Sequence, residues 1–212
     1  MPKITKQRWD EAQVAERQFH DGLTFDEGVE HYRQSYEQYF SYVGVDMNNL
    51  QKENIIEVGC ADYPALSYCK NFHYGFIIEP MSSEYLVRII DNHNQIMMSS
   101  ANYPEDNKLL LITKTVEEMD MQEFPVDSEV WLFNVMQHIL DPQIFLDKLK
   151  SVAKTIRFFE PINTDISVCH PQAYTLEYFQ EQFGDCVKHY PHNPTAVNFH
   201  TWECAYGVWE KQ

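Results

Sequence analysis

The sequence predicts an α/β fold built on a largely parallel β-sheet, and three observations lead to this class. After residue 50, short apolar runs alternate with amphipathic stretches, which is typical of strands that alternate with helices. The chain has 212 residues and is 44% hydrophobic, which is enough to build one domain around a sizeable core. The C-terminal end carries two strand-like segments joined by a polar stretch, which favours an antiparallel hairpin at the sheet edge.

Two helices are expected before the sheet begins. Apolar and aromatic residues recur there at helical spacing in two successive stretches. Thr24 followed by Glu27 has the pattern of a capping box that opens the second helix, and Gly44 is suited to end it. We therefore expect a helical N-terminal cap over residues 1–49 and an α/β domain over residues 50–212, the two forming one structural unit.

The α/β domain is predicted to alternate strands with helices before the hairpin. The strands are expected near residues 54–58, 74–78, 108–113, 129–134 and 155–160. The helices are expected near residues 64–71, 82–91, 142–153 and 175–183. The two hairpin strands follow at Cys186–Tyr190 and Trp202–Glu210.

The composition excludes several classes of partner. The chain has 16 Lys and Arg against 32 Asp and Glu, a formal net charge of −16, and so acidic a surface repels nucleic acids and anionic lipids. No apolar signal core or membrane-spanning stretch is present, and the five cysteines are scattered, as in reduced proteins. We therefore expect a soluble cytoplasmic protein without nucleic-acid or membrane partners. The sequence does not predict its oligomeric state.

The stretch NIIEVGCADYPAL, residues 54–66, reads as a strand that runs into a ligand-binding turn. Glu57 and Gly59 fall at the carboxyl end of this strand, where open α/β sheets bind ligands. Glu79 ends the next strand, about 20 residues later, where a carboxylate accepts hydrogen bonds from ribose hydroxyls. A carboxylate at Glu57 would repel a pyrophosphate, so it suits a cofactor that presents a cationic sulfonium and an ammonium group.

Five stretches in this order resemble the motifs of the class I S-adenosylmethionine-dependent methyltransferases: EVGCADYPAL, FIIEPM, ITKTVEEMDM, EVWLFNVMQHILDPQIFLDKL and IRFFEP. The resemblance covers roughly residues 50 to 185. It implies a Rossmann-like sheet of seven strands with the last strand antiparallel, S-adenosylmethionine as the cofactor, and direct methyl transfer to a small-molecule acceptor. Among acceptors we favour a hydroxyl of a sugar or nucleotide-sugar.

The resemblance also implies a cofactor site. Glu79 matches the acid that binds the ribose, Glu117 and Glu118 match the position that meets the adenine, and Arg33 is placed to clamp the methionine carboxylate. The full set of expected cofactor-binding residues is Glu57, Gly59, Cys60, Ala61, Asp62, Glu79, Glu117, Glu118, Asn134, Val135, Gln137 and Arg33.

The first loop departs from the family pattern, because Ala61 stands where the family has a second glycine. Alanine is tolerated there if the backbone angle φ is negative and is costly if φ is positive. Asp62 and Tyr63 are expected to add contacts that compensate.

Two histidines are candidates for a general base. His138, in NVMQHILDP, is the first, because imidazole titrates near neutrality and can take a hydroxyl proton. His170, in HPQAYT after the fifth strand, is the second, with Thr175 as the N-cap of the next helix. A structural role for His138, holding its loop through a carbonyl, stays open at this point. No metal site is expected, since the remaining histidines lack ligand spacing.

Two other functions stay open. A methyltransferase-like fold that has lost catalysis would serve as a binding or scaffolding module, and the thinned glycine loop is the evidence for it. A nicotinamide-dependent oxidoreductase would bind a pyrophosphate at the first loop, which Glu57 and Asp62 oppose by charge.

Overall fold

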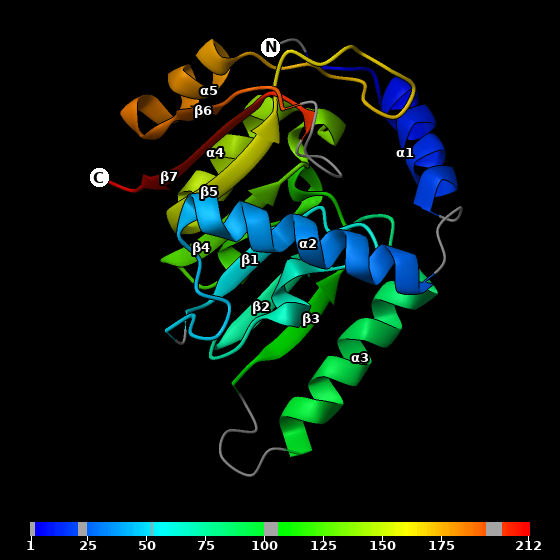
Figure 1. The fold of residues 1–212 in the computed structure, drawn as a ribbon, viewed down its shortest axis with the longest axis vertical. Coiled ribbons are helices and arrows are strands. Elements are labelled where there is room, and N and C mark those ends of the chain that lie inside the picture. The colour runs from blue at the N-terminus through cyan, green and yellow to red at the C-terminus, as the bar shows by residue number, and fades with distance from the viewer. Residues whose placement is uncertain (1–2, 21–24, 52, 100–105, 194–200) are drawn as a thin grey trace.

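The computed structural model describes residues 3–20, 25–51, 53–99, 106–193 and 201–212. Figure 1 shows a twisted central sheet with helices on both of its faces. The sheet has seven strands in the order β3-β2-β1-β4-β5-β7-β6. Their bounds are β1 Ile55–Val58, β2 Tyr74–Ile78, β3 Lys108–Ile112, β4 Ser128–Phe133, β5 Ala153–Pro161, β6 Lys188–Tyr190 and β7 Cys204–Glu210.

Strand β7 runs antiparallel to both of its neighbours, β5 and β6, while the other strand pairs are parallel. The expected fold class is therefore confirmed, including the antiparallel last strand. The hairpin predicted at the C-terminal end is the β6 and β7 pair, in which Tyr190 lies opposite Cys204.

The helices are α1 Lys6–His20, α2 Phe25–Val43, α3 Glu84–Ser99, α4 Pro142–Val152 and α5 Leu176–Phe183. Gly44 follows α2 with φ of +69° and ends it as expected. Thr175 caps α5, since its side chain accepts a hydrogen bond from the Tyr178 backbone N–H. The capping box predicted at Thr24 and Glu27 lies outside the described residues.

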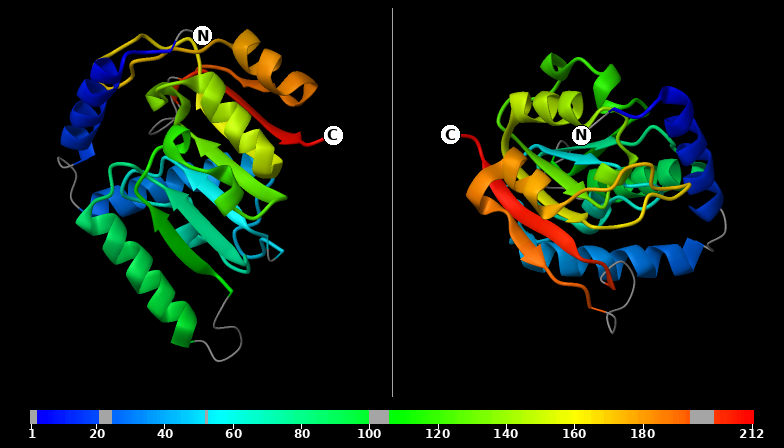
Figure 2. Two further views of the ribbon diagram at one scale, coloured as in Figure 1. Left: turned by 180° about the vertical axis from the view of Figure 1, so that it is seen from behind. Right: turned by 90° about the horizontal axis from the view of Figure 1, so that it is seen from above.

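Both faces of the sheet are buried, as in other parallel sheets covered by helices. Alternate residues of β4 show this, because Val130 and Leu132 join the cluster beneath α4 and α5, while Trp131 and Phe133 join the cluster beneath α2 and α3. Figure 2 shows α2 lying along one face of the sheet. Aromatic side chains make that contact, with the rings of Tyr39 on α2 and Phe159 stacked at 4.7 Å.

The prediction of a helix at residues 64–71 is wrong. The chain forms one turn of 3-10 helix there, η1 Ala65–Tyr68, and returns to an extended backbone at Cys69. The aromatic residues of α2 fill the space over this part of the sheet, and η1 packs against α2 and α3. Helix α3, by contrast, continues well beyond its predicted end at residue 91.

Helix α1 covers neither face of the sheet. It lies across the carboxyl ends of the parallel strands, to the right in Figure 1. Its anchor points are the loops after β4 and β5: the Ile4 backbone N–H donates to the Leu140 carbonyl at 3.3 Å, and the Arg8 guanidinium donates to the Val168 carbonyl at 2.9 Å. In the part of the chain that the structure describes, no helix is long and apolar enough to cross a membrane.

Candidate active site

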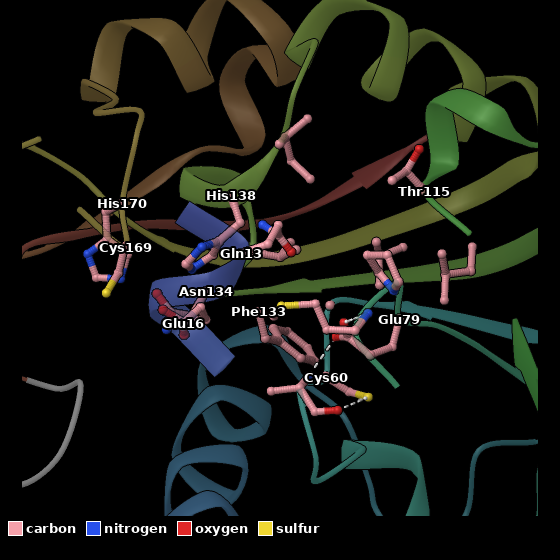
Figure 3. A pocket seen from close by; sticks show the side chains of 18 of the residues that line it. Gln13, Glu16, Cys60, Glu79, Thr115, Phe133, Asn134, His138, Cys169 and His170 are labelled. Carbon is pink, nitrogen blue, oxygen red and sulfur yellow. Dashed lines mark hydrogen bonds between the residues drawn. The ribbon is translucent and has the colours of Figure 1, made fainter. Parts of the chain in front are cut away.

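A cavity of about 260 Å³ opens at the carboxyl ends of β1, β2, β4 and β5, beneath α1 (Figure 3). The main segments that line it are the loops after β1, β4 and β5, the ends of β2 and β4, the turn after β3, and residues of α1 and α2. Open α/β sheets bind ligands at this edge, so the cavity lies where the sequence predicted a site.

The first loop reaches the cavity at Gly59, Cys60 and Ala61. Gly59 has φ of +72°, and a Cβ atom added to it would lie 2.2 Å from Cγ2 of Val135. A glycine is therefore required there by both backbone angle and space. Ala61 has φ of +50°, so the second family glycine has been replaced at a position where a Cβ atom is costly.

Glu79 ends β2 with its carboxylate at the cavity wall. One oxygen accepts a hydrogen bond from the Ala61 backbone N–H and the other from the Met81 backbone N–H, each at 2.8 Å. These two bonds orient the carboxylate at the cavity wall, and a carboxylate oxygen can accept more than one hydrogen bond. The carboxylate is 3% exposed and held rigidly, which suits the ribose-binding role expected for it.

Glu57 has a different position from the one predicted. Its carboxylate oxygens accept hydrogen bonds from the backbone N–H groups of Ala65 at 2.6 Å and Leu66 at 2.9 Å. It is not among the described residues that line the cavity, and burial raises its pKa to about 7. Glu57 therefore orders the turn after the first loop and does not present its charge to a ligand.

Glu160 uses the same arrangement at the end of β5 and was missed as a functional residue. Its carboxylate accepts hydrogen bonds from the backbone N–H groups of Val135 at 3.0 Å and Met136 at 3.0 Å. Burial raises the pKa of this fully buried group to about 8. Glu160 fixes the start of the loop that carries His138. A charged residue inside the apolar run IRFFEP was the signal that the sequence offered.

Asn134 follows β4 in the left-handed region, with φ of +58°, and lines the cavity. Its Oδ1 atom is buried and has no hydrogen-bond partner among the described residues. Buried polar atoms are nearly always paired, so an unpaired acceptor at a cavity wall points to a ligand. Val135, the next residue, also lines the cavity, whereas Gln137 is fully buried and does not.

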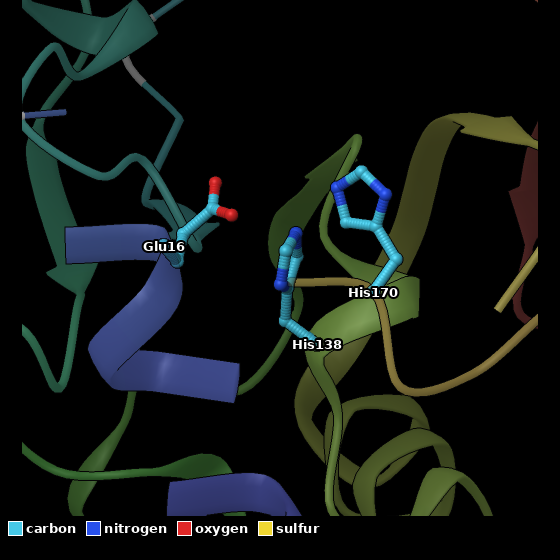
Figure 4. Close-up of side chains that lie close together, drawn as sticks. All are labelled: Glu16, His138 and His170. Atoms are coloured by element: carbon cyan, nitrogen blue, oxygen red, sulfur yellow. The ribbon is translucent and has the colours of Figure 1, made fainter. Parts of the chain in front are cut away.

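The two predicted histidines come together at the end of the cavity covered by α1. The ring centroids of His138 and His170 lie 5.1 Å apart in an edge-to-face arrangement. Glu16, on α1, joins them, and the ligand-type atoms of the three side chains all lie within 4.8 Å of one another (Figure 4). Burial lowers the pKa of His170, and the nearby Glu16 opposes this shift. No sequence pattern indicated that Glu16 belongs here.

His138 also has the structural role that the sequence left open. Its backbone carbonyl accepts a hydrogen bond from the Trp9 indole Nε1 at 2.7 Å, which ties α1 to the loop after β4. This bond uses the backbone carbonyl and does not involve the imidazole, and His138 lines the cavity.

Several other predicted cofactor residues have structural partners. Arg33 forms ion pairs with Glu30 at 2.9 Å and with Glu37 on the surface of α2, and it does not line the cavity. The expectation that it clamps the cofactor carboxylate is therefore not supported by its position. Asp62 is buried and pairs with Arg17 of α1 at 3.1 Å.

The two glutamates after β3 differ in their positions. Glu118 accepts a hydrogen bond from the Thr115 backbone N–H at 3.1 Å, which is a helix-capping role, and it does not line the cavity. Glu117 lines the cavity and accepts a hydrogen bond from the Asp141 backbone N–H at 3.1 Å. Of this pair, Glu117 is the one placed to meet a cofactor.

The cavity has an acidic and aromatic wall. Its described lining includes the carboxylates of Glu16, Glu79 and Glu117 and contains no Lys or Arg. The rings of Tyr36 and Phe133 also line it. Such a wall favours neutral or cationic ligands and disfavours phosphates, because like charges repel and aromatic faces attract cations.

The sequence matches no protein-family model and no curated protein. The structure is similar to the methyltransferase domain of a bacterial CtHen1, with a TM-score of 0.54 and 15% identity, over 85% of this chain and 100% of that one. It is also similar to the N-methyltransferase NodS from Bradyrhizobium japonicum WM9, with a TM-score of 0.51 and 11% identity, over 85% of this chain and 96% of that one.

A third similar structure is the cyclase SpnF, with a TM-score of 0.50 and 13% identity, over 71% of this chain and 55% of that one. The chain has the class I methyltransferase fold, in agreement with its strand order. Identities this low show the fold alone, and a cyclase with the same fold shows that the reaction has to be argued from the site.

Proposed function

We propose that this protein transfers a methyl group from S-adenosylmethionine to a small-molecule acceptor inside the cavity. The observation that carries the proposal is the position of Glu79. Its buried carboxylate directly follows the second strand of a methyltransferase fold, holds the first loop through the Ala61 backbone N–H, and lines the cavity.

The residues around Glu79 fit the proposed cofactor. Gly59 lets the backbone approach a ligand closely, and the unpaired Oδ1 of Asn134 offers an acceptor for its ammonium group. Glu117, which matches the family position that meets the adenine, lines the cavity. The acidic, aromatic wall suits a ligand with sulfonium and ammonium charges, and the sulfonium supplies the electrophilic methyl group.

The acceptor is proposed to bind at the end of the cavity where α1 meets His138 and His170. A neutral hydroxyl compound such as a sugar suits this region. A nucleotide-sugar suits it less, because its pyrophosphate would meet carboxylates and find no Lys or Arg among the described lining residues. The protein's own contribution is to hold acceptor and cofactor in line and to exclude water, while one imidazole takes the hydroxyl proton.

Calorimetric titration of the protein with S-adenosylmethionine and with S-adenosylhomocysteine tests the proposal. Wild type is expected to bind both, and Glu79→Ala is expected to weaken binding at least about tenfold, since charge-assisted hydrogen bonds contribute about 1.5–3 kcal/mol each. Glu118→Gln is the matched control, because this nearby carboxylate lies outside the cavity lining and its loss should leave the affinity unchanged.

Absence of binding to wild type would contradict the proposal and favour a binding or scaffolding module. Equal weakening by both variants would contradict the specific role of Glu79.

A further inference from the structure

Glu16, His138 and His170 come from three separate segments of the chain. Glu16 lies on α1, His138 in the turn after β4, and His170 in the loop after β5. All three line the cavity, and one carboxylate oxygen and two imidazole nitrogens lie within 4.8 Å of one another.

We propose that these three side chains form a binding site for one divalent transition-metal ion. Two imidazoles and one carboxylate on one side of an ion are a common ligand set, and they leave the remaining coordination positions open. Because all three residues line the cavity, those open positions would face the space in which a substrate binds.

The donor atoms indicate which ions fit. Imidazole nitrogen suits Zn²⁺, Fe²⁺, Co²⁺ and Ni²⁺, whereas Mg²⁺ and Ca²⁺ prefer sites made entirely of oxygen. Zinc bonds to nitrogen and oxygen are about 2.0–2.2 Å long, so the ligand atoms need to draw in slightly from their present separation. A different rotamer of the Glu16 side chain would supply part of this contraction.

The site would deepen the proposed function, on which this step rests. Open coordination positions next to one another bind two neighbouring oxygen atoms of a ligand, as in a vicinal diol or a hydroxy-carbonyl group. The acceptor class would then be a compound with two adjacent oxygens. The histidines would act as ligands in this case, and the bound ion would lower the pKa of a coordinated hydroxyl so that its proton passes to water.

The test uses the full-length protein stripped of metal with EDTA and then dialysed. Titration with ZnCl₂ and with CoCl₂ is followed by calorimetry, and cobalt binding is also followed by its visible absorption. One ion per chain is expected to bind. Glu16→Gln and His170→Gln should each weaken binding by about tenfold or more, since even loss of a group that supports a ligand costs about 10–100-fold in affinity.

His189→Gln is the matched control. This histidine also pairs with a carboxylate, Glu203, at 2.6 Å, but it lies on β6 and is not among the described lining residues of the cavity. Its replacement should leave metal affinity unchanged. Circular dichroism of each variant verifies that the fold is retained.

Lack of metal binding by wild type would overturn the inference, as would binding that Glu16→Gln and His170→Gln leave intact. Titration of stripped protein with S-adenosylmethionine separates the two proposals. Cofactor binding without metal binding overturns the metal site and leaves the proposed function standing. The opposite outcome is that wild type binds the metal, the two ligand variants bind it weakly, and wild type does not bind S-adenosylmethionine. This result supports the metal site and contradicts the proposed function.

Discussion

The indole Nε1 of Trp9 donates a hydrogen bond to the backbone carbonyl of His138 across 2.7 Å. This bond joins α1 to the loop after β4 at the point where that loop delivers the His138 imidazole to the cavity. The helix that covers the cavity is thereby fastened to the loop that carries one of the two proposed bases. Arg17 and Asp62 make a second connection, between α1 and the first loop, at 3.1 Å.

Trp9→Phe should loosen α1 while keeping an aromatic ring in place. Loss of this part-buried hydrogen bond is expected to destabilise the protein by about 1 kcal/mol, measured by urea unfolding. Limited proteolysis should also cut the N-terminal region sooner. Val14→Ala is the control, because Val14 is 60% exposed on α1 and its truncation should change stability by less than about 0.5 kcal/mol. Equal effects of the two substitutions would contradict a fastening role for Trp9.

Ala61→Gly should stabilise the protein. A Cβ atom in the left-handed region destabilises the folded protein by about 1–2 kcal/mol, and Ala61→Gly removes this cost. Glycine also makes the unfolded chain more flexible, which offsets part of the gain, so we expect a net stabilisation of about 0.5–1 kcal/mol. Gly59→Ala should have the opposite effect, since its Cβ would meet Val135 at 2.2 Å. Urea unfolding measures both variants, and loss of stability in Ala61→Gly would contradict the strain at Ala61.

The contribution of Glu160 to stability should fall as pH rises from about 4 to about 8, the range between the ordinary pKa of glutamate and the raised value of this group. The pKa of Glu160 is raised to about 8 in the folded protein, against about 4.3 in an unfolded chain. Near neutrality the folded chain therefore holds a proton that the unfolded chain has released. The contribution is fully present below the unfolded pKa and is lost as pH rises through the folded pKa.

Glu57 acts in the same direction, because its pKa is raised to about 7. Glu160→Gln removes one of the two groups, so its unfolding free energy should fall less steeply over the same pH range. Urea unfolding at several pH values measures the slopes for wild type and variant. An unchanged slope in Glu160→Gln would show that Glu160 does not carry a raised pKa.

Asn134→Gly should weaken cofactor binding without a large loss of stability. Glycine accepts the φ of +58° at this position, so the substitution removes the side-chain acceptor and keeps the backbone. Loss of one hydrogen bond to a charged group is expected to reduce affinity for S-adenosylmethionine by about tenfold or more, measured by calorimetry. Unchanged affinity would indicate that Asn134 does not face the cofactor.

The sheet could be predicted from the sequence because its strands are short apolar runs that end in Gly, Glu or Asn. These strand ends also placed Glu79 and Asn134 at one edge, and the predicted histidines His138 and His170 do meet in space. The helix at residues 64–71 could not be predicted correctly, because packing against α2 decides the local structure there.

The other differences between the predicted and the observed site also have local causes. Strand-end position did not reveal that the Glu57 carboxylate turns toward the backbone of Ala65 and Leu66. Arg33 lies on the surface of α2, where it pairs with Glu30 and Glu37, whereas Glu16 lies on α1 and lines the cavity. Sequence periodicity predicts both helices but does not state where each one docks, so Glu16 could not be foreseen.

A crystal structure with S-adenosylhomocysteine bound would show whether Glu79 binds the cofactor ribose. We expect the nucleoside inside the cavity, with both ribose hydroxyls within hydrogen-bonding distance of the Glu79 carboxylate and the amino-acid portion near Gly59 and Asn134. A cavity that stays empty at saturating ligand, or a nucleoside bound away from Glu79, would contradict this expectation.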